Sequence, residues 1–492
     1  MEARRHILNS RLCDAALSRL APSAILPAYD RSATRIGVVH FGPGAFHRAH
    51  QAFFIDRMLA HDPGLAICAV SLHNEAVRAA LGPQDGLYSL IVREFEPSIR
   101  IIGSIKTVLT APSATEAIFA RLADPTVRFV SATVTEKGYC LTPSGDLDLS
   151  HPGIGQDLAD PDNPQTLIGW LVAGLRRRRA AGGPGLTALS CDNLSGNGAR
   201  WRGASLQFAE ACGDFDLARW IEDRVVFPDG MVDAITPATD EGLRSEAEQR
   251  LGLLDAWPIQ REGFAQWVIG GDLGGDAATF AQAGVTFTRD IDAFERAKLR
   301  LLNGAHSTLA YVGLRLGFAT VSQAMADAKL GAFIETLMRR DIAASLRPTT
   351  GQDLNSYISE ILARLRNPAI VHQLSQIAWD GSQKLPVRLL ETITEALEAG
   401  RPAARLVTGI AAWMLFIRTR SQSGFTITDP LAERLNEIGR ACDGEAIADV
   451  DRFLALRAVF PARLVTDAQF RMALATAYGQ LAGPDPASAF AL

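Results

Sequence analysis

The sequence predicts an α/β domain with a mostly parallel sheet, followed by an all-α domain. Short apolar strand patterns alternate with helical patterns through the first part of the chain. Such alternation is typical of parallel strands joined by helices. From about residue 288 onward, almost every segment has the periodicity of an amphipathic helix. We therefore expect two domains, at residues 1–287 and 288–492.

The elements of the first domain follow in chain order. The first long strand is expected at RIGVVHFG, and FHRAHQAFFIDRMLAHD follows it with helical periodicity. Further apolar runs predict strands at LAICAVSL, YSLIVREF, SIRIIGSI, VRFVSATVT and LTALSCDN. Helical segments such as ATEAIFARLA and TLIGWLVAGLRRRR lie between several of these strands. Beyond VTFTRDIDAF the pattern becomes helical up to RMALATAY near the end of the chain.

Composition narrows the class of protein. The chain is 48% hydrophobic and 21% charged, as ordinary globular proteins are. Its net charge of −5 gives no reason to expect a nucleic-acid partner, and the basic run Arg176–Arg179 suits a helix C-terminus. No apolar stretch is long enough to span a membrane, and no secretory signal is evident. Six scattered cysteines without a CxxC pair fit a reducing compartment. We expect a soluble, cytoplasmic protein.

A glycine turn directly follows the first long strand. In GPGAFH, Gly42 would allow the tight turn and Gly44 the close approach of a pyrophosphate, which the following helix N-terminus would stabilise. His47 occupies the place of the usual third glycine. A plain strand-to-helix turn is the alternative, but the strand context favours a dinucleotide site. The flanking residues Phe41, Ala45 and Phe46 complete the candidate contacts.

The end of the second strand bears on the cofactor. In AVSLHNEA, Glu75 is the candidate acid for the ribose hydroxyls, although it is farther from the glycine loop than usual. NAD is therefore favoured, and NADP is not excluded. His47 and His50 also form an HxxH pattern, but no third ligand at metal spacing accompanies it. We expect no metal site.

The segment ERAKLRLLNGAH, residues 295–306, places polar groups on one helix face. At roughly 100° per residue, Glu295, Lys298 and His306 fall within a sector of about 80°, with Asn303 at its edge. A lysine can exchange the proton of a hydroxyl, an amide can donate to the oxygen, and an imidazole can orient it. A solvated or core-facing helix surface is the alternative interpretation.

Several motifs occur in one order: GPGAFHRAHQ, TVTEKGYC, SCDNLSGNG, FPDGMVDAITP, and K-x4-N-x2-H at Lys298, Asn303 and His306. Together they resemble the polyol-specific long-chain dehydrogenases, a family that includes mannitol 2-dehydrogenase and fructuronate reductase. The resemblance covers nearly the whole chain. It implies a Rossmann-type domain, a helical domain, an active site between them, and hydride transfer without a metal.

The resemblance also implies roles for particular residues. Lys298 would be the general acid/base, Asn193 and Asn303 would stabilise the oxyanion, and His306 would hold the substrate oxygen. Glu295 and Glu136 would carry protons or set the charge of the lysine. Asp233 would belong to a supporting hydrogen-bond network. Taken alone, Asn193 could equally cap a turn, and Asp233 could be a buried structural acid.

The segment HQLSQIAWDGSQKLPVRLL, residues 372–390, resembles the fructuronate reductase branch. Lys384 would contact substrate hydroxyls, and Arg388 and His372 are the candidates for binding a substrate carboxylate by charge-assisted hydrogen bonds. Ordinary packing or surface duty is the alternative for those two. We expect NAD-dependent interconversion of D-mannonate and D-fructuronate, in hexuronate catabolism, by a monomer or dimer. A mannitol 2-dehydrogenase, a non-catalytic NAD(H) sensor and a zinc alcohol dehydrogenase are the rival interpretations.

Overall fold

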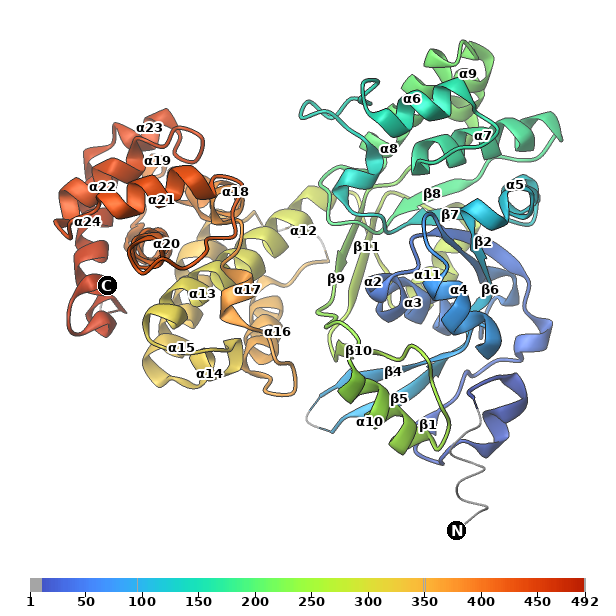
Figure 1. Ribbon diagram of the computed structural model, residues 1–492, viewed down its shortest axis with the longest axis horizontal. Helices are drawn as coiled ribbons and strands as arrows, with labels where there is room; N and C mark the ends of the chain where they lie inside the picture. The colour runs from blue at the N-terminus through green and yellow to red at the C-terminus, as the bar shows by residue number, and fades with distance from the viewer. Residues whose placement is uncertain (1–10, 95, 348, 350, 491–492) are drawn as a thin grey trace. The chain divides into compact units, whose positions relative to one another are not determined.

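The computed structural model describes residues 11–94, 96–347, 349 and 351–490. It divides into two compact units, Met1–Ile291 and Asp292–Leu492 (Figure 1). The first unit contains the sheets and the second is helical. The expected class of fold is therefore confirmed. No helix in the described part of the chain combines the length and the apolarity needed to cross a membrane.

The first unit is built on a five-stranded parallel sheet in the order β6-β3-β2-β7-β8. The strands are β2 (Ile36–Phe41), β3 (Ala66–Ser71), β6 (Ile105–Thr110), β7 (Phe129–Ala132) and β8 (Thr187–Ser190). The chain runs outward from β2 through β3 to β6, and then returns to the other side of β2 at β7. The switch point between β2 and β7 is where parallel α/β sheets place their ligands.

Helices cover both faces of this sheet. Because alternate side chains of a strand point to opposite faces, Phe41 packs with Trp170 in one core and Val38 with Phe54 in the other. The helices of this unit are α2 (Ala45–Ala49), α3 (Gln51–Met58), α4 (Ala76–Leu81), α5 (Thr115–Ala123), α6 (Pro152–Ala159), α7 (Leu167–Ala180), α8 (Asn197–Ala211), α9 (Phe215–Arg224), α10 (Glu241–Leu251) and α11 (Ala277–Gln282).

Two smaller sheets complete the first unit. One has the order β1-β5-β4-β10 and the other β12-β11-β9. Their strands are β1 (Ala24–Ile25), β4 (Tyr88–Arg93), β5 (Ser98–Ile102), β10 (Ile259–Glu262), β9 (Gly230–Asp233), β11 (Gln266–Gly270) and β12 (Thr286–Thr288). The predicted strands YSLIVREF and SIRIIGSI are thus an antiparallel pair outside the main sheet. The link between them is too short for a crossover helix, so only a hairpin can join them.

The second unit surrounds one largely buried helix, α20 (Ala404–Gln422), which packs against α13, α21 and α24. Figure 1 shows α20 end-on. The other helices are α12 (Ile291–Ala297), α13 (Ala305–Arg315), α14 (Val321–Ala326), α15 (Ala328–Thr336), α16 (Leu354–Arg366), α17 (Leu374–Ile377), α18 (Gly381–Leu385), α19 (Glu391–Glu398), α21 (Ala432–Ala441), α22 (Ala446–Leu454), α23 (Ala462–Val465) and α24 (Ala468–Ala482). Among the described residues, three π-helical segments interrupt them: η8 (Lys298–Gly304), η9 (Leu337–Ile342) and η11 (Pro386–Leu390).

A buried acid makes the stability of the first unit depend on pH. Asp56 on α3 accepts hydrogen bonds from the Tyr29 hydroxyl at 2.7 Å and the Gly103 N–H at 2.8 Å. Burial raises its pKa from the ordinary value of 3.8 to about 6. The folded state therefore holds an extra proton between these pH values, and stability falls as the pH rises through that window.

We expect Asp56→Asn to remove this pH dependence. The free energy of unfolding of the wild type, relative to the variant, should fall by about 2–3 kcal/mol between pH 4 and pH 7. Urea unfolding at both pH values measures it. Asp223→Asn, at an exposed acid of α9, is the matched control and should leave the pH dependence unchanged. A parallel pH dependence in Asp56→Asn and wild type would contradict the prediction.

Candidate active site

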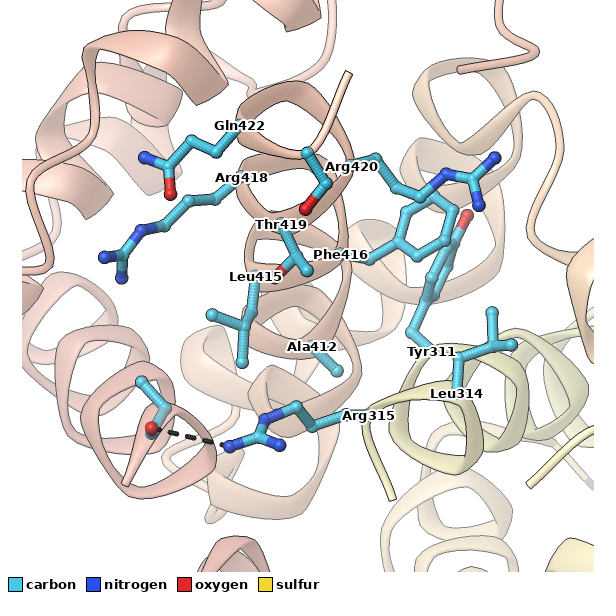
Figure 2. Close-up of a pocket in the computed structure, with 12 residues that line it drawn as sticks. Tyr311, Leu314, Arg315, Ala412, Leu415, Phe416, Arg418, Thr419, Arg420 and Gln422 are labelled. Carbon is cyan, nitrogen blue, oxygen red and sulfur yellow. Dashed lines mark hydrogen bonds between the residues drawn. The ribbon is translucent and has the colours of Figure 1, made fainter. Parts of the chain in front are cut away.

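A cavity of about 490 Å³ in the helical unit contains none of the predicted site residues. Figure 2 shows it beside α13 and α20. Its arginines have structural partners: Arg315 donates to the Leu481 carbonyl at 2.8 Å and Arg420 to the Thr426 carbonyl at 2.7 Å. Arg418 lies 3.7 Å from a carboxylate oxygen of Asp449. These arginines hold helix ends and neighbouring helices in place. Because they already have structural partners and no predicted site residue lines this cavity, we place the candidate site elsewhere.

The glycine loop lines a cavity of about 540 Å³ in the first unit. The cavity lies at the carboxyl ends of β2, β3 and β7, which is the switch point of the main sheet. Gly42 has a φ of +84°, and a Cβ there would lie 2.1 Å from the Thr133 carbonyl oxygen. A Cβ on Gly44 would have no protein atom closer than 3.9 Å. Gly42 is therefore needed for the turn, while the space beside Gly44 is open.

Two histidines, His40 and His47, pack against the glycine loop. The His40 ring stacks on that of His47 with centroids 3.4 Å apart, and His40 Nε2 lies 3.2 Å from the Gly42 carbonyl oxygen. His47 thus packs flat against a strand residue where the usual third glycine would stand. Burial lowers the pKa of His40 to about 3 and that of His47 well below its usual value, so both are neutral.

The two histidines of the HxxH pattern, His47 and His50, each contact a different protein group and not a common metal position. His47 Nδ1 lies 3.0 Å from Gln51 Oε1, and His50 Nε2 lies 2.8 Å from the Gln266 carbonyl oxygen. Across the described residues, no group of three or more His, Cys, Asp or Glu side chains is placed to hold a metal ion. Both histidines therefore have an evident role in packing the glycine loop.

Glu75 lies just beyond the residues that line the cavity. Ser71, Leu72, His73 and Asn74 line it at the end of β3. The Glu75 carboxylate instead accepts hydrogen bonds from Arg78 Nε at 2.5 Å, the Ser113 hydroxyl at 2.7 Å and the Thr110 hydroxyl at 3.1 Å. The acid proposed for the ribose thus has three protein partners.

The turn after β8 holds the SCDN motif in a fixed shape. Asp192 is buried and accepts the N–H groups of Val134 and Thr135 at 3.0 and 2.8 Å, together with the Tyr139 hydroxyl. Thr135 has a φ of +67° and ψ of 165°, a region that costs a non-glycine residue about 1–3 kcal/mol. The two bonds to Asp192 therefore hold a strained backbone at the edge of the cavity.

The predicted residues of this unit lie around that turn. Asn193 is exposed directly after Asp192, and Glu136 is exposed at the start of the short 3₁₀ helix η6 (Glu136–Tyr139). Burial, with a contribution from Glu136, raises the pKa of Asp192. Asn197 donates to the carbonyls of Asp192 and Gly230, which ties the turn to β9, where Asp233 is buried. Asp192 and Asn197 were not predicted as site residues, although both stand in SCDNLSGNG.

In the second unit, the predicted catalytic helix is not regular. Lys298 begins the π-helical segment η8, Asn303 lies near its end, and His306 follows on α13. An α-helix would separate Lys298 and Asn303 by roughly 140° around the axis, which puts Asn303 outside the predicted sector and not at its edge. Because i→i+5 hydrogen bonds close a π-helix, residues five apart lie nearly above one another. The assumption of regular geometry is therefore wrong, and the change turns Asn303 toward the side of Lys298.

His306 lies among cationic side chains. It is 9% exposed, and its Nε2 has no hydrogen-bond partner within the described chain. Its ring meets that of His372 edge-on at a centroid distance of 4.8 Å. Burial lowers the pKa of His306 well below its usual value, and His372, Arg388, Arg364 and Lys384 lower it further. The structure thus places the rings of His306 and His372 together, and the charges of Arg388, Lys384 and Arg364 lower the pKa of His306. Arg364 was not predicted from the sequence.

Arg388 and Lys384 come from consecutive turns of α18 and η11. Lys384 Nζ donates to the Trp379 carbonyl at 2.6 Å, and Arg388 donates to the Ser307 hydroxyl at 3.0 Å. That bond is the one hydrogen bond of the Arg388 side chain among the described residues. A guanidinium has five N–H donors, so most of its donors are available to a ligand. Burial lowers the pKa of both side chains.

An ion pair between a buried arginine and a half-exposed glutamate holds η8 in place. Arg300, 3% exposed, makes two hydrogen bonds of 2.6 Å to the carboxylate of Glu395 on α19. A Cβ on Gly304 would lie 2.9 Å from the Arg388 carbonyl oxygen, so η8 and η11 approach closely there. The ion pair and this contact together fix the segment that carries Lys298 and Asn303.

We expect Glu395→Ala to destabilise the helical unit by about 2 kcal/mol, because it leaves a buried guanidinium without its charge partner. Glu398→Ala on the same helix is the matched control. It removes an exposed pair with Arg463, and such pairs contribute about 0–1 kcal/mol. Urea unfolding of both variants tests the difference. Equal losses of stability would show that the Arg300–Glu395 pair does not hold the segment.

Comparison with known proteins adds independent findings. Residues 36–276 match the model of the mannitol dehydrogenase Rossmann domain, and residues 290–482 match that of the mannitol dehydrogenase C-terminal domain. The chain is 37% identical to D-mannonate oxidoreductase of Escherichia coli over 465 residues, which cover 92% of this chain and 95% of that protein. It is 35% identical to the polyol:NADP oxidoreductase of Gluconobacter oxydans over 449 residues, which cover 89% and 92%.

A solved structure agrees with these matches. The mannitol 2-dehydrogenase of Pseudomonas fluorescens, in a ternary complex with NAD and D-mannitol, superposes with a TM-score of 0.81. It is 36% identical in sequence, and the match covers 98% of this chain and 99% of that chain. The similarity thus includes both units of the structure.

Proposed function

The chain belongs to the mannitol dehydrogenase family, and on that premise we propose that it interconverts D-mannonate and D-fructuronate. The chain is an NAD-dependent secondary-alcohol oxidoreductase. When bound, NAD accepts or donates a hydride at its nicotinamide ring. The open question is the sugar substrate, and the proposal is that it carries a carboxylate.

The cationic cluster around His306 is the observation that carries this proposal. Arg388 donates to the hydroxyl of Ser307, the residue after His306, and the charges of Arg388, Arg364 and Lys384 each lower the pKa of His306. The acids Asp380 and Asp429 act on Lys384, but no acid stands among the main influences on His306. A substrate carboxylate could accept charge-assisted hydrogen bonds from Arg388, whose guanidinium donates one hydrogen bond, to Ser307, among the described residues.

The reacting hydroxyl needs a proton acceptor and donors for its oxygen. We assign the exchange of the hydroxyl proton to Lys298, at the start of η8. Glu295, one turn earlier on α12, would be its partner in proton transfer. Asn303 and, from the first unit, Asn193 would donate to the oxygen as alkoxide character develops. His306 is neutral, so it can accept or donate a hydrogen bond to the same oxygen. Glu136 and Asp233 remain candidates for supporting roles.

The first unit would hold the cofactor at the carboxyl edge of its main sheet. Gly42, Gly44 and the N-terminus of α2 would receive the pyrophosphate, with Phe41, Ala45 and Phe46 beside them. Asp192 would hold the strained Thr135 backbone at the cavity edge. None of these roles for the first unit depends on which sugar is the substrate.

A mannitol 2-dehydrogenase activity is the second candidate. The Pseudomonas fluorescens relative with that activity is 36% identical, about as similar as the D-mannonate oxidoreductase. Lys384 would contact hydroxyl groups in either case. The two candidates differ in the need for Arg388 and His372, which a neutral polyol would not require.

Product identification tests the proposal. The enzyme is incubated with NADH and D-fructuronate, and separately with D-tagaturonate and D-fructose, and the products are identified by NMR. We expect D-mannonate from D-fructuronate as the dominant conversion. Mannitol from D-fructose as the dominant product would place the chain with the mannitol dehydrogenases and refute the uronate assignment.

A further inference from the structure

The segment around η6 has a backbone conformation that glycine normally occupies. Thr135, with a φ of +67° and a ψ of 165°, lies in a region of backbone space that is essentially restricted to glycine. A threonine is β-branched, so its side chain adds steric strain there. Four non-glycine residues in the described part of the chain have a positive φ, and two of them, Thr135 and Cys140, flank η6. Both line the cofactor cavity, so the strain lies in its wall.

Asp192 holds this segment at both ends. Before η6, its carboxylate accepts the N–H groups of Val134 and Thr135 at 3.0 and 2.8 Å. At the end of η6, it accepts the Tyr139 hydroxyl at 2.8 Å. Asp192 is itself fixed, because it is buried and its carbonyl oxygen accepts a hydrogen bond from Asn197 at 3.2 Å. Hydrogen bonds to a carboxylate are stronger than those between neutral groups, so Asp192 can offset the strain at Thr135.

The helical unit contains the same arrangement without the strain. The buried Asp449 accepts the N–H groups of Asp443 and Gly444, each at 3.0 Å, and the Tyr478 hydroxyl at 2.9 Å. The residue with the positive φ is a glycine there, since Gly444 has a φ of +99°. A glycine is therefore sufficient for such a turn. With a threonine in the corresponding place, the turn beside the cofactor cavity depends on its aspartate.

We propose that Asp192 is a positioning residue for the cofactor: it keeps Thr135 at a positive φ and thereby holds η6 as a preformed wall of the cavity. The inference rests on the proposal that NAD binds in this cavity, and not on the sugar substrate. Without the carboxylate, the strain would favour a negative φ at Thr135, and Glu136 and Lys137 would turn with it. The cofactor would then bind only the fraction of molecules that keep the strained turn, so its affinity would fall by that fraction.

Fluorescence titration of NADH tests the proposal without any sugar. Asp192→Asn should raise the dissociation constant for NADH by at least about fivefold, because strain at one such residue corresponds to about a 5- to 150-fold change in population. In the background of Thr135→Gly, the same substitution should raise the constant by no more than about twofold, since glycine adopts the positive φ without strain. Equal effects in the two backgrounds would overturn the proposal, as would normal binding of NADH by Asp192→Asn.

Asp449→Asn is the matched control, because it removes the same kind of acceptor from a turn built on a glycine. It should leave the dissociation constant for NADH unchanged in both backgrounds. Urea unfolding adds a readout that does not depend on the cofactor. Asp192→Asn should lower the urea midpoint less in Thr135→Gly than in the wild type, and equal shifts would contradict the proposal. If Asp192→Asn does not fold, the double variant should fold, and its failure to do so would also contradict the proposal.

Gly44→Val separates this inference from the placement of the cofactor. A Cβ at Gly44 has no protein atom closer than 3.9 Å, so valine fits the turn and fills the open space beside it. We expect this variant to lose NADH binding. If it does and Asp192→Asn binds NADH normally, the role of Asp192 is wrong and the cavity remains the cofactor site. If Gly44→Val binds NADH normally, the cofactor lies elsewhere and both proposals are refuted.

Discussion

Replacing Lys298 by alanine is expected to lower kcat by about 10²–10⁴-fold, the range that a positioned general acid/base contributes. The variant can still bind the dinucleotide, because the glycine loop and the cavity it lines belong wholly to the first unit. The dissociation constant for NADH should therefore change by no more than about twofold. Steady-state NADH oxidation with D-fructuronate and fluorescence titration of NADH measure the two quantities.

The control for this substitution is Lys329→Ala, at an exposed lysine of α15 in the same unit. It should leave both quantities unchanged. A small primary amine added to Lys298→Ala should restore part of the turnover, because it can take the place of the missing base. Near-normal turnover of Lys298→Ala would remove the lysine from the chemical step.

Replacing Arg388 by methionine is expected to reduce kcat/KM for D-fructuronate by about 10- to 100-fold, the value of a charge-assisted hydrogen bond. Methionine keeps the length and apolar part of the side chain, so the packing of η11 against η8 should persist. The same substitution should change kcat/KM for D-fructose by less than about threefold, since a neutral ketose has no carboxylate to lose. Parallel kinetics with both sugars test the selectivity of the effect.

Arg434→Met is the matched control, because Arg434 is exposed on α21 and pairs with Glu437. It should affect neither sugar. Equal losses for D-fructuronate and D-fructose in Arg388→Met would mean that the arginine acts through the structure of the site and not through a substrate carboxylate.

The sequence predicted the main features of the first unit because they depend on short patterns. The buried strand at Ile36–Phe41, the glycine turn and the following helix are contiguous, so strand periodicity and glycine chemistry are sufficient to predict them. The ordered motifs also predicted the family correctly. The separate pairing of β4 and β5 was missed, because strand patterns do not tell which sheet a strand joins.

Other features of the site depend on contacts between distant segments. The π-helical segment at Lys298–Gly304 has the same apolar pattern as a regular helix over so few residues, so periodicity cannot reveal it. Arg364 was missed because an arginine is usually exposed, and its burial near His306 follows from the packing of α16. Glu75 accepts hydrogen bonds from Thr110 on β6 and from Ser113 in the turn that follows β6. No local motif indicates these two contacts.

The central claim is that the cationic cluster of Arg388, Arg364 and Lys384 selects a substrate with a carboxylate. The most direct measurement is the ratio of kcat/KM for D-fructuronate to that for D-fructose, with NADH near neutral pH. We predict a ratio of at least about 100, which corresponds to about 2.7 kcal/mol of differential transition-state binding. A ratio near one, or a preference for D-fructose, would contradict the claim and favour a neutral ketose as the substrate.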